Sequence, residues 1–95
     1  MMNSTATVPT VSGSKYLQQL CKHWSHKLEV ELVDRHAIVR FPTATATMTA
    51  AAEDLIVRID AEDEATLERM EGVLATHLDR FAFREAPLPF AWHRG

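Results

Sequence analysis

The chain has 95 residues, of which 46% are hydrophobic, and a formal net charge of −3. A chain of this length forms one domain around one core, and its apolar content is too high for a disordered protein. Domains that bind nucleic-acid duplexes carry a clear basic excess, so the negative charge argues against a nucleic-acid partner. Cys21 is the single cysteine, which excludes an intrachain disulfide.

The ends of the sequence predict a cytoplasmic protein without a membrane partner. The first residues contain no basic segment followed by an apolar one, so we expect no secretory signal. No apolar run reaches the ~20 residues that a membrane-spanning helix needs. We expect a single domain over residues 1–95, with disorder in residues 1–4. The C-terminal segment 86–95 should dock on the domain, because Phe90 and Trp92 are too apolar for a free end.

The N-terminal part predicts a strand followed by a helix. Residues 5–8 alternate polar and apolar and stop at Pro9, which is typical of a short edge strand. Residues 12–14 offer N-caps for a helix from about Lys15 to His26. Its apolar side chains fall within one arc. Its far side carries polar and basic side chains, namely Lys15, Gln19, Lys22, His23 and His26.

Four further segments have the period of two that strands show when one face is buried. They are residues 28–32, 37–41, 45–50 and 55–59. In the third, threonines alternate with Ala46, Met48 and Ala50, which predicts a threonine ladder on the outer face. The connections between these segments are short, which predicts an antiparallel meander.

A second amphipathic helix is predicted from about Asp63 to Arg84. Its apolar side chains form a narrow stripe of Leu67, Met70, Leu74, Leu78 and Phe81. The first turn is acidic and the last turns are basic, as the helix dipole favours. The order β-α-β-β-β-β-α, with one apolar face on each element, predicts an α+β fold. Both helices should pack on one face of a mostly antiparallel sheet.

Three residues of the first helix are of types that bind metals. His23 and His26 are three residues apart, so they share a helix face and could chelate one ion together. Cys21 lies roughly 140–200° around the helix axis from both. We therefore expect Cys21 to be a small buried hydrophobe. We interpret His23 and His26 as part of a solvated basic face and as weak metal candidates only, and we predict no cofactor.

His77 lies on the flank of the apolar stripe of the second helix, so it should be at least half-buried. It can be a core histidine with a hydrogen-bond partner. Alternatively, it joins Arg80 and Arg84 in a cationic stripe for a carboxylate or phosphate. The two arginines could instead pair with Asp79 or Glu85. The sequence has no glycine-rich phosphate loop and no nucleophile elbow, so no residue is assigned as catalytic.

Two long stretches, residues 16–27 and 77–85, together with the closing Trp92, resemble a bacterial family of uncharacterised proteins, the domain of unknown function 2218 (DUF2218). The resemblance covers nearly the whole chain and implies a bacterial protein. It also implies a connection to iron or siderophore metabolism, because some family members lie near or are fused to siderophore-interacting, flavin-dependent ferric reductases. The family brings no established catalytic residues. Its motifs include the positions of Cys21, His23, His26, His77, Arg80 and Arg84.

Together these observations favour a non-catalytic binding module linked to iron or siderophore metabolism, with an anionic small ligand or a protein partner. The residues expected to make the contact are Lys22, His23, His26, His77, Arg80 and Arg84. One alternative is a structural homodimer joined through an exposed strand edge or the apolar tail. The other is a small enzyme in which His77 or His23 transfers protons while an arginine holds an anion.

Overall fold

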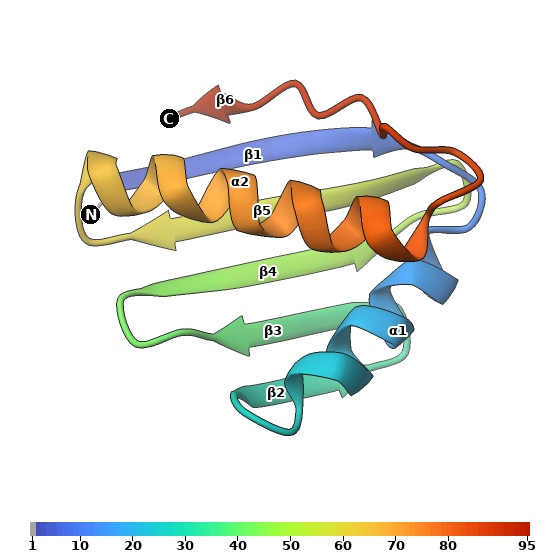
Figure 1. Cartoon of the computed structure of the whole chain (residues 1–95), viewed down its shortest axis with the longest axis horizontal. Helices are drawn as coiled ribbons and strands as arrows, with labels where there is room; N and C mark the ends of the chain where they lie inside the picture. The colour runs from blue at the N-terminus through green and yellow to red at the C-terminus, as the bar shows by residue number, and fades with distance from the viewer. Residues whose placement is uncertain (1) are drawn as a thin grey trace.

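The computed structural model describes residues 2–95 and shows two helices on one face of a six-stranded antiparallel sheet (Figure 1). The strand order is β2-β3-β4-β5-β1-β6. This arrangement confirms the predicted α+β fold. The elements are β1 (Met2–Pro9), α1 (Gly13–Trp24), β2 (Glu29–Val33), β3 (His36–Arg40), β4 (Ala44–Ala50), β5 (Asp54–Ala61), α2 (Glu64–Phe81) and β6 (His93–Arg94).

In strands β1 to β5, every second side chain faces the helices, and nearly all of these side chains are apolar. Across neighbouring strands these side chains form rows on the inner face of the sheet. In one such row, neighbouring strands contribute Ala37, Met48, Val57 and Ala6, all without exposed surface. The threonines of β4 lie on the other face and are half-buried. The meander from β2 to β5 follows from the short turns, which allow only antiparallel neighbours.

The helices divide the inner face of the sheet between them. α1 contacts β2 to β5 and α2 contacts β4, β5 and β1, so the helices share β4 and β5, and they also contact each other. Of Asp63, where the helix was predicted to begin, and Asp60, the competing candidate, Asp63 is the N-cap of α2, since its carboxylate accepts a hydrogen bond of 2.7 Å from the Thr66 N–H. Within residues 2–95, no helix combines the length and the hydropathy needed to cross a membrane.

Both helices end earlier than the sequence predicted. α1 covers Gly13–Trp24, so His26 lies in the turn before β2. α2 ends at Phe81, and a turn follows in which Glu85 and Ala86 donate their N–H groups to the carbonyl of Ala82. Arg84 therefore lies in this turn and not on α2, a difference that matters for the candidate site.

The N-terminal residues differ from the predicted disorder of residues 1–4. Residues 2–4 belong to β1, which pairs with β5 along its whole length, and Met1 lies outside the described residues. β1 is also not the edge strand that the sequence predicted, because His93 and Arg94 of β6 pair with it.

The C-terminal segment lies against the body of the domain. Leu88 is buried and donates its N–H to Asp79 at 2.9 Å. The rings of Phe90 and Trp92 stack with centroids 5.5 Å apart. Figure 1 shows this segment running beside β1 before it ends in β6.

Candidate functional site

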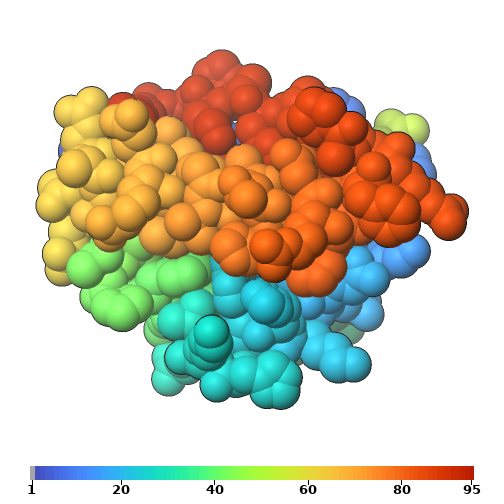
Figure 2. Space-filling model, viewed as in Figure 1, coloured from blue at the N-terminus to red at the C-terminus, as the bar shows by residue number. Residues whose placement is uncertain are grey.

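The two helices lie side by side on the outer face of the molecule (Figure 2), and their junction brings together two of the predicted site residues. The rings of His23 on α1 and His77 on α2 have centroids 5.8 Å apart. His23 also meets the Phe81 ring edge to face, with centroids 6.0 Å apart. His23 is exposed, as expected, and its ring contacts two rings of α2.

His77 is half-buried and is hydrogen-bonded within its own helix. Its Nδ1 lies 2.7 Å from the carbonyl oxygen of Val73. Because a carbonyl oxygen can only accept, Nδ1 carries the proton, and in the neutral ring Nε2 keeps a free lone pair. The Trp24 ring lies 5.1 Å from the His77 ring, centroid to centroid. These contacts agree with the interpretation of His77 as a histidine with a satisfied partner.

Cys21, His23 and His26, the three residues of metal-binding types, do not point to a common site. Cys21 is only 2% exposed and is the small buried hydrophobe that the helix period predicted. Burial raises the pKa of its thiol. His26 lies beyond the end of α1, so the spacing argument that placed it on one helix face with His23 does not hold. Among residues 2–95, no three histidine, cysteine, aspartate or glutamate side chains are grouped so that they could hold a metal ion.

A cavity of about 150 Å³ lies where the start of α1 meets the end of α2. It is lined by Lys15, Tyr16, Phe81, Phe83 and Arg84. The Arg84 guanidinium carbon lies 5.7 Å from the centroid of the Phe83 ring, and Phe83 is 72% exposed. The cavity thus combines two cationic side chains with an aromatic wall, a combination that suits an anion carrying an aromatic or apolar part.

A hydrogen-bonded network fixes one side of this cavity. The Tyr16 hydroxyl donates to a carboxylate oxygen of Glu85, and the Thr10 hydroxyl lies 3.1 Å from both oxygens of the same carboxylate. The bond to Glu85, and then burial, raises the pKa of Tyr16. Thr10 also accepts the N–H of Ser12 at 3.1 Å. The network ties the turn after α2 to the start of α1.

Arg80 and Arg84 are not neutralised by the acidic residues that the sequence suggested as partners. Asp79 accepts from the Leu88 N–H, and Glu85 accepts from Tyr16 and Thr10. Within the described part of the chain, the salt bridges of arginine involve Arg40, Arg58 and Arg94. The expected pairing with Asp79 or Glu85 is therefore wrong, since no salt bridge of residues 2–95 joins either arginine to either carboxylate.

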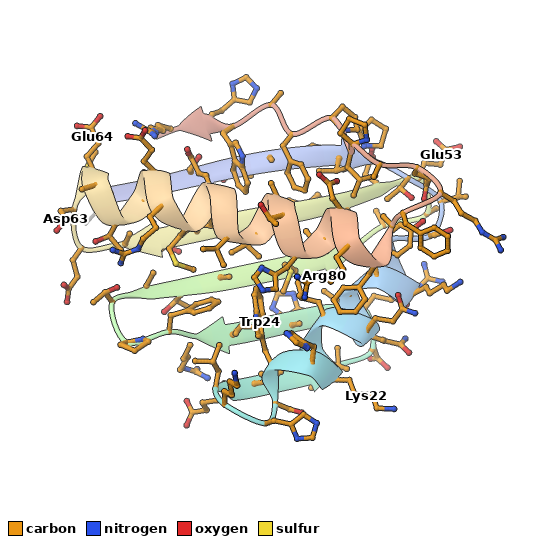
Figure 3. The ribbon with its side chains drawn as sticks, in the orientation of Figure 1. Lys22, Trp24, Glu53, Asp63, Glu64 and Arg80 are labelled. Atoms are coloured by element: carbon orange, nitrogen blue, oxygen red, sulfur yellow. The ribbon has the colours of Figure 1, made fainter. Side chains whose placement is uncertain are left out.

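Charge is separated along α2. Figure 3 shows Asp63 and Glu64 at one end of α2 and Arg80 near the other end, on the side of α1. Lys22, another predicted site residue, points away from α2 and lines a different cavity beside β2. The structure therefore divides the predicted residues. His23, His77, Arg80 and Arg84 lie along the helix junction, and Lys22 and His26 lie away from it.

The sequence did not identify Lys15, Tyr16 or Phe83 as site residues. Lys15 and Tyr16 are more than 60 positions from Arg84 in the sequence, and they meet it only because α1 and α2 pack together. Phe83 and Arg84 were predicted to lie within or at the end of the second helix, whereas the structure places them in the turn after α2. The sequence offered one signal for this cavity, since a basic residue adjoins an aromatic one both at Lys15-Tyr16, near the start of the first helix, and at Phe83-Arg84, near the end of the second.

The family described as "Uncharacterized protein conserved in bacteria (DUF2218)" matches residues 5–93. A solved structure, the NMR structure of PA4090 from Pseudomonas aeruginosa, is similar with a TM-score of 0.84 and 35% sequence identity. The similarity covers 98% of this chain and 96% of that chain. No curated protein matches the sequence.

Proposed function

The chain belongs to DUF2218, a family without an assigned activity, and from its geometry we propose that it is a non-catalytic module that binds an anionic ligand at the junction of α1 and α2. The cavity lined by Lys15, Tyr16 and Arg84 carries this proposal. The anionic group lies between the two cations, and its apolar part lies against the phenylalanine rings.

Charge supports an anion at this position. Lys15 and Arg84 line the cavity, and neither forms a salt bridge to a carboxylate of residues 2–95. A guanidinium group with free donors binds carboxylates and phosphates through charge-assisted hydrogen bonds. Glu85 stands next to the cavity and keeps its negative charge while it accepts hydrogen bonds from Tyr16 and Thr10, but the two cationic side chains outnumber it. The cations are therefore available to an external anion.

Size limits the ligand. Drug-sized ligands occupy pockets of roughly 300–1,000 Å³. The cavity of about 150 Å³ is smaller and suits a single ring with a carboxylate or phosphate group, or one such arm of a larger molecule. A ferric catecholate complex is anionic and aromatic, so it is the member of this ligand class that fits the proposed link to iron and siderophore metabolism.

The geometry supports binding more than acid–base chemistry. His77 lines neither the cavity between the start of α1 and the end of α2 nor the cavity beside β2, and its Nδ1 is held by Val73. A general acid or base must reach the proton that it transfers. His77 instead packs against Trp24 and His23, where it supports the helix junction beside the cavity.

The proposal is tested by titrating the isotope-labelled protein with 2,3-dihydroxybenzoate, with its ferric complex and with inorganic phosphate. We expect NMR shift changes at Tyr16, Phe83 and Arg84 with the aromatic anion. Arg84→Gln should weaken binding by about tenfold or more, because it removes a charge-assisted hydrogen bond. Binding of phosphate alone would identify the anion site without the aromatic preference.

Arg58→Gln is the matched control, since it removes the same charge from the opposite face of the sheet. It should leave the affinity unchanged. If no anion shifts the residues of the cavity, or if both variants weaken binding equally, this function is excluded.

A further inference from the structure

A second groove lies on the other side of α1, along the edge strand β2. It has a volume of about 370 Å³ and is lined by Gln18, Cys21, Lys22 and Ser25 on the helix side and by Val30 and Leu32 on the strand side. The helix residues have the spacing i, i+3, i+4 and i+7, which is one helix face. The strand residues are two apart, which is one strand face. The groove therefore runs between one helix face and one strand face.

The backbone of β2 is open along this groove. Asp34 and Arg35 form the turn to β3, so Val33 and His36 are the first pair of the hairpin. In a hairpin with a two-residue turn this first pair is hydrogen-bonded, and hydrogen-bonded pairs then alternate along the strands. Val33, Glu31 and Glu29 therefore bond to β3. The N–H and C=O groups of Val30 and Leu32 point to the open edge, where another strand can pair with them.

The apolar side chains of β2 are covered less than those of its neighbour. Leu32 is 41% exposed, whereas Ala37 opposite it on β3 is fully buried. Val30 is half-buried, and Val39 opposite it is fully buried. At the other side of the sheet, β6 pairs with Ser4 and Thr5 of β1. β2 is thus an edge of the sheet where the backbone groups of Val30 and Leu32 have no neighbouring strand among residues 2–95 and where Leu32 is largely uncovered.

Charge selects what can occupy this edge. Glu29 and Glu31 lie on the other face of β2 from the groove, and both bond to the single guanidinium of Arg40. A second copy of the chain, paired antiparallel over the whole of β2, would place Glu31 opposite its own copy. Like charges directly opposite each other destabilise a strand pair. A strand that places lysine or arginine opposite Glu29 and Glu31 would instead be attracted, because two carboxylates share the one positive charge of Arg40.

We propose that this groove binds an extended peptide segment of a partner protein, which adds a strand to β2. Its apolar side chains, at alternate positions, pack in the groove against Val30, Leu32 and the Cys21 region of α1. Its intervening side chains are basic and lie beside Glu29 and Glu31, on the face of the sheet away from Lys22. Backbone hydrogen bonds supply affinity and the alternating side chains supply selectivity, as in other strand-addition complexes.

The test uses the full chain and a short capped peptide of alternating lysine and valine, titrated to ~1 mM, where weak binding is still detected. We expect shift changes and slowed hydrogen exchange at the amides of Val30 and Leu32. A glutamate–valine peptide of equal length should not bind. A lysine–valine peptide with N-methylated valines lacks the donors and should also fail, a comparison that needs no protein variant.

Leu32→Lys should weaken binding of the lysine–valine peptide by about tenfold, because it puts a charge in the groove. Val33→Thr, on the opposite face of the same strand, should have no effect. Absence of binding, equal binding of the lysine and glutamate peptides, or shift changes away from β2 would overturn the proposal. So would a dimer in sedimentation whose interface protects Val30 and Leu32. None of these results affects the anion site between α1 and α2.

Discussion

The Tyr16 hydroxyl joins the first turn of α1 to the turn after α2 through its bond to Glu85. This bond, with burial, raises the pKa of Tyr16 in the folded protein above the value of ~10 in an unfolded chain. A raised pKa stabilises the fold at pH values below the unfolded pKa, and this contribution is lost as the pH rises through the folded pKa.

We predict that Tyr16→Phe, which keeps the buried ring, lowers the free energy of unfolding at pH 7 by about 1 kcal/mol, the net value of one hydrogen bond. The difference from the unmodified protein should shrink above pH ~10, where the tyrosine ionises. Urea unfolding at several pH values measures both effects. Glu85→Gln keeps an acceptor and should cost less at pH 7. Equal stability of Tyr16→Phe and the unmodified protein at every pH would contradict a structural role for the contact.

At the scale of single residues, the sequence predicted what depends on one helix. The burial of Cys21 and the half-burial of His77 follow from the 3.6-residue period, and the structure confirms both. The cavity could not be predicted, because Lys15 and Arg84 meet only after the helices pack. The place of Arg84 also depends on where α2 ends, and helix ends are weakly encoded in local sequence.

At the scale of elements, the two helices hold glycines in opposite surroundings, one in open space and one in close contact with β5. Gly72 lies at an exposed position of α2, where an added Cβ would meet no atom within 4 Å. A Cβ on Gly13 would instead lie 3.2 Å from the Leu55 Cβ and 3.3 Å from the Asp54 carbonyl oxygen. Gly13 therefore allows the start of α1 to approach β5 closely.

We predict that Gly72→Ala raises the free energy of unfolding by about 0.5–1 kcal/mol, since alanine loses less backbone entropy in a helix. Gly13→Ala should lower it by about 1–2 kcal/mol through crowding against β5. Chemical denaturation of the two single variants measures both changes. A gain of equal size in both would show that α1 does not approach β5 as closely as the structure indicates.

The helices and strands could be predicted where a periodic pattern of apolar residues extends over the whole element. The α2 stripe and the alternation in β3, β4 and β5 gave the correct faces, because each has a buried side. β2 was predicted to have one buried face, yet Val30 is only half-buried and its neighbours are exposed. Alternation reports which face a residue lies on, but burial at an edge depends on what covers it. Whether a strand lies at the edge of the sheet depends on contacts between residues far apart in the sequence, so local alternation does not reveal it.

At the scale of the whole molecule, Glu71 on α2 connects β1 and β6, which are the first and last strands in the chain and neighbours in the sheet. Its carboxylate accepts a hydrogen bond of 2.7 Å from the buried Ser4 hydroxyl and two from Arg94, at 3.1 and 3.3 Å. Burial alone would raise the pKa of Glu71, but the bonds from Arg94 and Ser4 outweigh it, so the pKa is lowered. One carboxylate thus holds β1 and β6 against α2.

The sign of this pKa shift predicts an acid-sensitive connection. A lowered folded pKa stabilises the protein above the unfolded value of ~4.3, and the contribution is lost as the pH falls through the folded pKa. Glu71→Gln should therefore lower the melting temperature at pH 7 and reduce its dependence on pH below ~4. Hydrogen exchange at the β1–β6 pairing should also become faster.

Glu53→Gln, a control in the exposed turn before β5 (Figure 3), should keep the acid dependence of the unmodified protein. If Glu71→Gln and Glu53→Gln melt alike from pH 7 to pH 3, other groups set the acid stability, and Glu71 does not hold the two strands together.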